Sequence, residues 1–427
     1  MLSGMEPFET SEPLSKPRRR SLLPRLIGCA LLAPQGALAV STGYLLTLLL
    51  AARGVAQAAT TPLVASPGGL RFVVLVPAHD EQSGIRATLE SLELCSYPRD
   101  AWRTIVIADN CTDRTGDCAR EAGIEVWERT DPRRRGKGFA LGWALDRLQA
   151  EGNTFDAVVV LDADCVASSN LLSAIDQRLR SGAHAVQVDY VVANPDDSNA
   201  SALRFSGFAL MNTVRFLGKQ RLGLSCGLVG TGMAFTRDLL AREPWTATGF
   251  VEDAEYHLRL VHAGERSEFV PEASVSSAVP TSLKASSDQQ ARWEQGKLQL
   301  IRHWSPRLVS AGLAQRDIVR IHAGLEWLVP PQSLIAAGSM GSALAGLLLG
   351  SRRLVLLSAG TLAAQLTFVL AGLRLVRAPI KAYRALLLAP ALIARKVALY
   401  VRLLRGRGPT SWVRTEREAP ATSRRTG

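Results

Sequence analysis

The sequence predicts an α/β fold, a mostly parallel sheet with helices on both faces, flanked by transmembrane helices. Between residues 71 and 280, short runs rich in β-branched residues alternate with segments of helical pattern, which is typical of a parallel sheet covered by helices. Uncharged apolar stretches at 26–52, 333–350 and 354–373 are long enough to cross a bilayer at about 20 residues per span. The chain of 427 residues is too long for one ordinary core.

The region before the first apolar stretch, residues 1–25, is a basic tail that we expect in the cytosol or at a lipid surface. It contains Lys16, Arg18, Arg19, Arg20 and Arg25. The net charge of +12 is concentrated in this tail and at the carboxyl-terminal end, which favours contact with anionic lipid. The basic residues are not interleaved with aromatic residues and no recognition motif is present, so we expect no nucleic-acid partner.

Residues 26–52 are predicted to form a membrane anchor. A cleaved signal peptide could use the small residues at 37–39, but the apolar stretch continues well beyond them. A lipoprotein cleavage box is disfavoured because no apolar region precedes "LIGC". Pro34 and Gln35 interrupt the stretch, so it either spans the bilayer or forms a re-entrant hairpin. The hairpin would satisfy the positive-inside preference, because it keeps the basic tail on the cytoplasmic side. Residues 53–70 are expected to be a linker.

Three predicted strands of the region 71–280 end on acidic residues. The strands in "VVLVPAHDE", "IVIADNCTD" and "VVVLDADC" are followed by Asp80 and Glu81, by Asp109 and Asp113, and by Asp162 and Asp164. Ligands bind beyond the carboxyl ends of parallel strands, so we expect these acids at one edge. Clustered carboxylates repel one another unless a cation or a ligand compensates, and hard oxygen ligands favour Mg²⁺ or Mn²⁺. Each acid alone could instead cap the next helix, and for Asp80 and Asp113 the two interpretations have equal weight.

Two loops are candidates for contact with a bound ligand. In "DPRRRGKGFAL", Lys137 lies between two glycines at the start of a helix, where backbone amides and an ammonium group attract phosphate. The turn "GLVGTGMAF", residues 227–235, permits a close backbone approach to a ligand. It is not a P-loop, because neither Gly-Lys-Ser nor Gly-Lys-Thr follows.

Two further motifs complete the candidate site. Glu252 and Asp253 precede an amphipathic helix, which they could simply cap, but a carboxylate pair facing the same cleft would also supply a general base. In "QQARW", Arg292 and Trp293 follow Gln289. An arginine and an aromatic ring together can clamp a diphosphate and stack on a sugar.

The carboxyl-terminal part is predicted to return to the membrane. Residues 281–332 hold the Q-x-x-R-W segment and interfacial helices, and 333–373 hold two transmembrane helices whose glycine and alanine content suits close packing in lipid. Residues 374–427 are a basic amphipathic segment and tail, expected along the membrane interface, with a third span as the alternative. The six cysteines form no C-x-x-C pair and are expected to be reduced thiols.

The motifs "VPAHDE", "DNCTD", "GKGFAL", "DADC", "GTGMAF", "VEDAEY" and "QQARW", in this order, resemble those of the inverting family 2 glycosyltransferases. Within that family the chain is similar to the membrane-embedded group that includes cellulose, chitin and hyaluronan synthases, and its layout looks closest to bacterial exopolysaccharide glycosyltransferases. The resemblance implies a GT-A fold for residues 71–280.

The resemblance also implies roles for individual residues. Pro77 and Glu81 would lie at the nucleotide pocket, Asp109 would hydrogen-bond uracil, Asp162 would face the ribose and diphosphate, and Asp164 would ligate the metal. Lys137 is expected on the phosphates from its position in the loop. Further residues would form the acceptor and diphosphate side, with Asp253 as the catalytic base: Gly230, Thr231, Glu252, Gln289, Arg292 and Trp293.

We therefore expect transfer of a sugar from a nucleotide-sugar, a UDP-sugar by the resemblance, to a growing polysaccharide of the cell envelope. The expected location is the bacterial inner membrane, with several spans and a cytoplasmic catalytic domain, because such donors are cytosolic in bacteria. Three alternatives stay open. They are single-sugar addition to a lipid-linked oligosaccharide, loading of a polyprenyl phosphate carrier, and a non-catalytic role in an exopolysaccharide assembly complex.

Overall fold

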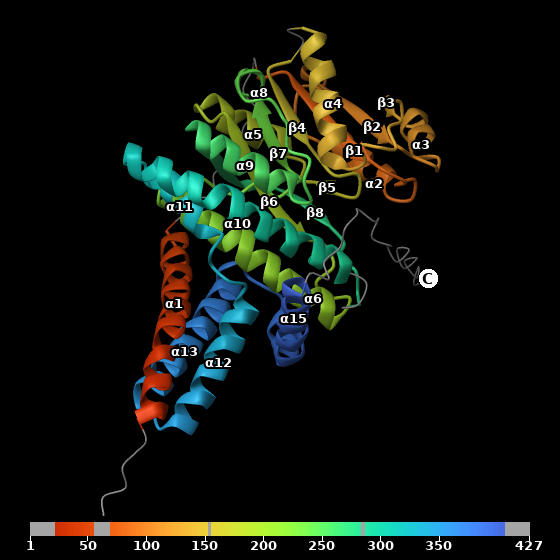
Figure 1. The fold of residues 1–427 in the computed structure, drawn as a ribbon. Coiled ribbons are helices and arrows are strands. Elements are labelled where there is room, and N and C mark those ends of the chain that lie inside the picture. Colours follow the sequence, from red (N-terminus) through yellow and green to blue (C-terminus); the bar gives the residue numbers. More distant parts are fainter. Residues whose placement is uncertain (1–21, 55–68, 153–154, 283–286, 406–427) are drawn as a thin grey trace, which may run out of the picture.

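The computed structural model describes residues 22–54, 69–152, 155–282 and 287–405 (Figure 1). The predicted tail 1–25 and linker 53–70 lie largely outside these residues. The strands are β1 Phe72–Ala78, β2 Trp102–Asp109, β3 Glu125–Arg129, β4 Ala157–Val160, β5 Val166–Ala167, β6 Ala185–Val192, β7 Met233–Thr236 and β8 Ser267–Ser277.

Helices cover the sheet and extend away from it. Those of the first part are α1 Leu22–Ala52, α2 Ile85–Glu93, η1 Arg99–Ala101, α3 Thr115–Glu121, α4 Lys137–Ala150, α5 Leu171–Arg180, α6 Asn199–Phe208, the π-helical η2 Ala209–Val214, α7 Arg215–Arg221, α8 Arg237–Arg242 and α9 Glu252–Ala263. Those that follow are α10 Ser287–Gln315, α11 Ile318–Glu326, α12 Gln332–Leu349, α13 Arg352–Leu375, α14 Ile380–Ala385, η3 Leu386–Leu388 and α15 Ala389–Leu404.

The eight described strands form one sheet in the order β3-β2-β1-β4-β7-β6-β8-β5. β1, β2, β3 and β4 run parallel to their neighbours, and so do β6 and β8, whereas β7 runs antiparallel to both β4 and β6. The short β5 is antiparallel to β8. The sheet is therefore mixed, and its parallel half places the ends of β1, β2 and β4 at one edge.

The sheet separates two apolar cores, because alternate residues of each strand point to opposite faces. In β1, Val74 and Val76 pack with α2, α3 and α5, whereas Val73 and Leu75 pack with α4, α8 and α9. Figure 1 shows these two groups of helices on the two sides of the strands. The predicted α/β fold with helices on both faces is confirmed.

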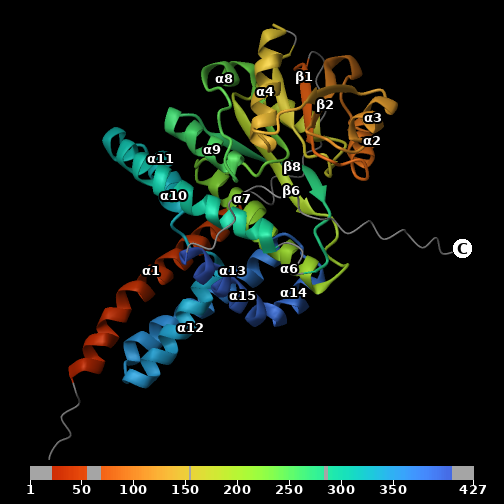
Figure 2. The same ribbon diagram turned by 45° about the vertical axis from the view of Figure 1, so that its right-hand side comes forward.

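Three described helices, in the segments Leu26–Ala52, Gln332–Leu349 and Arg352–Leu375, are long and apolar enough to cross a membrane. They pack together as a bundle on one side of the sheet domain (Figures 1 and 2). Gln35 of α1 is buried in the bundle, where its Nε2 donates to Ser339 Oγ of α12 at 3.3 Å and to Thr361 Oγ1 of α13 at 3.0 Å.

The break anticipated at Pro34 is not present, because α1 runs as one helix from Leu22 to Ala52. A proline in a helix interior removes one backbone hydrogen bond, and close packing of neighbouring helices can tolerate that loss. The residue after Pro34 is anchored to both partner helices, which holds the backbone straight through this point. The structure thus contradicts the hairpin of two half-helices as the form of residues 26–52.

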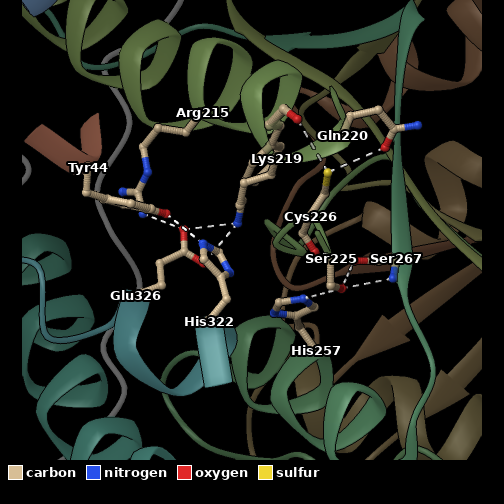
Figure 3. A network of polar contacts seen from close by, with 11 residues as sticks. Tyr44, Arg215, Lys219, Gln220, Ser225, Cys226, His257, Ser267, His322 and Glu326 are labelled. Carbon is tan, nitrogen blue, oxygen red and sulfur yellow. Dashed lines mark hydrogen bonds and ion pairs between the residues drawn. The ribbon is translucent and has the colours of Figure 1, made fainter. Parts of the chain in front are cut away.

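A buried polar junction connects α1 to the sheet domain (Figure 3). Glu326 of α11 pairs with Lys219 of α7, with both Nζ–Oε distances at 3.0 Å, and with Arg215 Nη2 at 2.5 Å. The Tyr44 hydroxyl of α1 lies 2.9 Å from His322 Nε2 of α11. Since these residues belong to three helices far apart in the sequence, the junction fixes the bundle to the domain.

Of the carboxyl-terminal helices, α14 packs against α6 of the sheet domain, whereas α15 packs mainly against α12 of the bundle (Figure 2). Glu294 of α10 accepts a charge-assisted hydrogen bond from Lys396 Nζ of α15 at 2.5 Å and another from the Tyr400 hydroxyl. The Q-x-x-R-W helix is thereby tied to the segment that we expected along the membrane interface.

Candidate active site

The D-x-D pair occupies the loop that follows β4. Asp162, Asp164 and Cys165 each offer a ligand atom, and these atoms lie within 4.8 Å of one another. Burial raises the pKa of the Cys165 thiol well above its usual value, and the charges of Asp162 and Asp164 raise it further. The thiol therefore stays protonated, and the two carboxylates are the donors left for a cation. Hard oxygen donors that are partly exposed to solvent fit Mg²⁺ or Mn²⁺.

Lys137 is the first residue of α4 and connects two parts of the site. Its ammonium group pairs with Asp162 Oδ1 and donates to the carbonyl oxygen of Gly230 at 2.6 Å. Burial disfavours the charged form of Lys137, but Asp162, Glu252 and Asp253 outweigh that penalty and raise its pKa above the usual value. The lysine therefore carries a positive charge between three carboxylates.

The glycine-rich turn after α7 brings backbone into the same space. Gly230 has φ of +87°, a conformation in which a side chain would be strained. A Cβ atom at this position would lie 3.3 Å from both Asp253 Oδ2 and Lys137 Nζ, so a side chain here would crowd the charged groups. Thr231 is buried, and its hydroxyl accepts the Asp162 backbone N–H at 3.1 Å. Thr231 thus joins the turn to the D-x-D loop.

Glu252 and Asp253 form the first turn of α9. Asp253 Oδ1 accepts the backbone N–H of Ala254 at 2.8 Å. Burial raises the pKa of Glu252 to about 7, and the charge of Asp253 contributes to that rise. Burial also raises the pKa of Asp253, while the nearby Lys137 opposes the shift. A carboxylate with a raised pKa is a stronger base than an ordinary carboxylate. The Asp253 carboxylate lies close to Lys137, which pairs with Asp162.

The end of β2 carries a buried ion pair. Asp109 Oδ1 lies 2.5 Å from Arg129 Nη1, and both side chains are 7% exposed. The two residues are register partners of adjacent parallel strands, which places them at the same edge. Pro77 of β1 is only partly buried at that edge. The other predicted nucleotide contact, Glu81, is buried beside it and donates its backbone N–H to Thr115 Oγ1 at 2.7 Å.

Asp80 and Asp113 mainly hold backbone in place. Asp80 accepts the backbone N–H of Thr112 at 2.6 Å and that of Asp113 at 3.2 Å. Asp113 in turn accepts the N–H of Gln82 at 3.1 Å and that of Thr115 at 2.9 Å. These contacts favour the loop-capping interpretation over the functional one for both acids.

The Q-x-x-R-W motif lies at the start of α10. Arg292 is buried, whereas Trp293 is 41% exposed and packs edge-on against Phe208 with ring centroids 6.4 Å apart. Phe208 packs in the same way against Tyr190 at 5.3 Å. The side chain of Gln289 lies outside the described residues. The motif is therefore connected to β6 through a row of aromatic rings.

The structure thus brings together the predicted residues Lys137, Asp162, Asp164, Gly230, Thr231, Glu252 and Asp253. Two residues of this edge were missed by sequence reasoning. Arg129 is the last residue of β3, and no regular alternation along that strand marks it as buried. Gln187 is buried, and its amide accepts from Val229 N–H at 2.9 Å and donates to the Thr231 carbonyl at 2.7 Å, so it holds the glycine-rich turn.

Comparison with known proteins gives relatives of one class. The chain is 29% identical over 237 residues to a Bacillus subtilis protein named probable glycosyltransferase YdaM, which covers 52% of this chain and 54% of that protein. It is 33% identical over 138 residues to the beta-monoglucosyldiacylglycerol synthase of Nostoc sp., covering 31% of this chain and 28% of that protein. The chain therefore spans about half or less of the length of these curated relatives.

A solved structure of similar shape is that of the mannosyltransferase PcManGT from Pyrobaculum calidifontis in complex with GDP-Man and Mn²⁺. It is 20% identical, covers 81% of this chain and 99% of that chain, and has a TM-score of 0.48. The family described as Glycosyltransferase like family 2 matches residues 67–296. The resemblance to the membrane-embedded synthases within the family stays a prediction. Because the family match spans more than half of the 427 residues, the chain belongs to glycosyltransferase family 2, as its seven motifs predicted, and the predicted GT-A fold is confirmed.

Proposed function

We propose that the protein transfers a sugar from a nucleoside-diphosphate sugar to an acceptor hydroxyl with inversion, and that Asp253 is the general base. The observation that carries the proposal is the position of Lys137 Nζ. It pairs with Asp162 of the D-x-D loop and donates to the Gly230 carbonyl, and the space next to Gly230 is bounded by Asp253. Asp162 of the proposed metal site and the proposed base Asp253 thus both lie close to one ammonium group.

The base would act in a single displacement. The Asp253 carboxylate takes the proton of the acceptor hydroxyl, and the hydroxyl oxygen forms the new bond to the anomeric carbon. The bond from that carbon to the diphosphate breaks at the same time, and the nucleoside diphosphate leaves with the bonding electrons. The raised pKa of Asp253 suits this role, because a carboxylate with a raised pKa is a stronger base than an ordinary aspartate.

The opposite side of the site would receive the donor. Asp162 and Asp164 would hold a divalent cation, which offsets negative charge on the departing diphosphate. Lys137 adds a fixed positive charge beside that position and, at the start of α4, the backbone amides favour anions. Pro77, Glu81 and Asp109 line the neighbouring strand ends, where we propose that the nucleoside lies, with uridine as the first candidate.

We further propose a membrane location with the sheet domain on the cytoplasmic side. Three helices have the length and composition of spans, and nucleotide-sugars are cytosolic in bacteria. The acceptor would be a glycan of the cell envelope, and exopolysaccharide synthesis is the leading candidate. Single-sugar addition to a lipid-linked acceptor is a second candidate. A relative of the chain is named for the synthesis of a glycolipid, which supports this alternative.

A donor panel tests the proposal. Membranes holding the wild type or Asp253→Asn would be supplied with UDP-, GDP- and TDP-sugars, with Mg²⁺ or Mn²⁺ or with a chelator. We expect turnover of one donor that requires metal and falls about 10²- to 10⁴-fold in the variant, as is usual for loss of a general base. Asp146→Asn, on the exposed face of α4, is the matched control and should retain activity.

Lack of turnover with every donor, in a folded wild-type protein supplied with membrane acceptors, would contradict the enzymatic function. That result would favour a non-catalytic role in an assembly complex. Turnover that persists in Asp253→Asn would keep the transferase but remove Asp253 as its base.

A further inference from the structure

A cavity of about 730 Å³ lies between the sheet domain and the bundle. Its walls come from the end of β6, from α6 and η2, from the start of α7 and from the segments that end α1 and α13. Figures 1 and 2 show that α6, β6 and α13 meet where the bundle joins the domain. The volume is typical of a ligand site, and none of the residues that line it belongs to the catalytic cluster described above.

Three guanidinium groups border this cavity. Arg53 follows α1, Arg374 lies in the last turn of α13, and Arg377 follows that helix. Within the described ranges, none of the three forms an ion pair with a carboxylate. Asp189 is the one acid among the lining residues, and it accepts a hydrogen bond from Thr213 Oγ1 at 2.7 Å. The cavity therefore has an excess of positive charge at the end where the candidate spans meet the domain.

The rest of the lining is apolar, and part of it has an unusual backbone. Phe205, Leu217 and Leu375 contribute hydrocarbon surface. Ala209 and Thr213 belong to η2, a π-helical segment inside the continuous run of α6, η2 and α7. Such π-helical turns are frequently found at functional sites. A cationic border with an apolar wall fits an amphiphile that has an anionic head group.

The cavity also borders the acceptor side of the catalytic site. Tyr190 lines it, and its ring packs against Phe208, which packs against Trp293 of the Q-x-x-R-W motif. The Tyr190 hydroxyl lies 2.6 Å from Ser277 Oγ. Burial raises the pKa of Tyr190, and Asp162 and Asp164 add to the shift, so this ring lies within electrostatic reach of the D-x-D pair.

We propose that the cavity binds the phosphate and the adjoining hydrocarbon of a lipid-linked saccharide, the acceptor of the reaction. The phosphate would bind to Arg53, Arg374 and Arg377. Its negative charge would pair with these three arginines, with which no described carboxylate pairs. The saccharide would extend past Asp189 and Tyr190 toward Trp293, and its hydroxyls can donate to the Asp189 carboxylate. This inference rests on the proposed function and names its acceptor class.

Binding of a defined lipid phosphate tests the cavity directly. The full chain in phosphatidylcholine nanodiscs would be titrated with farnesyl phosphate, farnesol or inorganic phosphate. We expect farnesyl phosphate to bind, and Arg374→Gln/Arg377→Gln to weaken its binding about tenfold or more, because each charge-assisted hydrogen bond contributes about one to two decades in affinity. Farnesol and inorganic phosphate should each bind at least tenfold more weakly than farnesyl phosphate.

Arg352→Gln/Arg353→Gln is the matched control, since both arginines are exposed at the other end of α13. It should bind farnesyl phosphate like the wild type. Ala371→Phe, which places a ring in the cavity, should abolish binding in a protein that keeps its charges. Equal binding by wild type and both cavity variants would overturn the proposal. Equal binding of farnesol would overturn the role of the arginines, and displacement by an equal concentration of phosphatidylglycerol would identify the site as one for ordinary anionic lipid.

Hydrolysis of the nucleotide-sugar by water separates this inference from the proposed function. It requires the catalytic cluster but no lipid acceptor. We expect both cavity variants to hydrolyse the donor at the wild-type rate while they lose transfer to membrane acceptors. Absence of donor hydrolysis in the wild type would count against the proposed function, and binding of farnesyl phosphate would still decide whether the cavity takes a lipid phosphate.

Discussion

At the scale of residues, the candidate site depends on the electrostatic interactions among four ionisable side chains that lie close together. Lys137 neutralises part of the repulsion among Asp162, Glu252 and Asp253, and its own charge is stabilised by them. The carboxylates at the start of α9 still have raised pKa values, because burial disfavours their charged forms more than the Lys137 ammonium group favours them. The surroundings of Asp253 therefore make it a stronger base than an ordinary aspartate, as the proposed role requires.

The pH dependence of activity should report this balance. As the pH falls through the raised pKa values, Asp253 gains a proton and can no longer act as a base, so kcat/KM should fall about tenfold per pH unit. The fall should begin well above the ordinary aspartate pKa of about 3.9. Removing a negative neighbour with Glu252→Gln should move it to lower pH, and removing the positive neighbour with Lys137→Met should move it to higher pH.

These shifts have opposite signs, so a general loss of activity cannot produce them. A profile that falls only near pH 4 in the wild type would show that Asp253 titrates normally. Acid unfolding is not expected to imitate the effect. A folded state with raised pKa values at these two carboxylates binds protons more tightly than the unfolded chain, so their protonation favours the folded state as the pH falls.

The charged residues of the site were predictable from the sequence where a strand or helix boundary marks them. Asp162 and Asp164 follow an apolar run, and Lys137 is bracketed by glycines. The roles of Arg129 and Gln187 could not be predicted from the sequence, because they depend on which residues lie opposite them across the sheet and at the glycine-rich turn. That information is set by strand register, which a single sequence does not contain.

At the scale of elements, α1 and α7 are held together by close packing and by the junction around Glu326. Gly218 of α7 makes the packing possible, because a Cβ atom there would lie 2.3 Å from the backbone oxygen of Leu48. Lys219 is 1% exposed and Glu326 is 9% exposed, so the pair is almost wholly removed from water. Although burial opposes the shift, the cations around Glu326 hold its pKa far below the usual range. Its contribution to stability is therefore present at neutral pH and is lost progressively as the pH falls below the pKa of an unfolded glutamate.

Neutralising this acid should be costly. Glu326→Gln leaves Lys219 and Arg215 buried without a counter-charge, and we expect the free energy of unfolding to fall by about 3–5 kcal/mol. Thermal unfolding of the full chain in detergent would measure it. Glu93→Gln, in an exposed pair with Arg99, is the control and should change stability by about 1 kcal/mol or less. Adding Lys219→Met to Glu326→Gln should recover part of the loss, and lack of any recovery would show that the charge is not the cause.

The positions of the helices in the bundle were well predicted from hydropathy, because an uncharged apolar run of this length is typical of a membrane-spanning helix. The continuity of α1 through Pro34 was not predicted. Pro34 is a strong local signal for a break, and it is overridden by Gln35, whose partners belong to helices about 300 residues away.

At the scale of the whole molecule, α12 leaves the domain and α13 returns to it, so the turn between them is far from the sheet (Figure 1). The start of α1 lies at that same end, since a Cβ atom at Gly28 would be 3.3 Å from Ser351 Cβ. If the domain is cytoplasmic and the three helices cross the bilayer, both Ser351 and the start of α1 face the outer side.

Labelling of single cysteines tests this arrangement. In sealed cells we expect a membrane-impermeant maleimide to reach Ser351→Cys but not Ser181→Cys, which lies on the exposed surface of the sheet domain. The unmodified chain gives the background from its native cysteines, and permeabilised cells show that both positions can react. Labelling of Ser181→Cys in sealed cells would place the domain outside, and protection of both positions would show that α12 and α13 do not cross.

The hydrogen bond between Tyr44 and His322 joins residues 278 positions apart, and this separation imposes an order on biosynthesis. The ribosome delivers α1 first, and α1 can enter the lipid while the sheet domain is still being made. Its partner His322 in α11 emerges only after all eight described strands of the sheet have been translated. The junction therefore forms late, when the sheet domain meets a helix that was translated before it. A chain arrested before residue 322 would hold its anchor without this attachment.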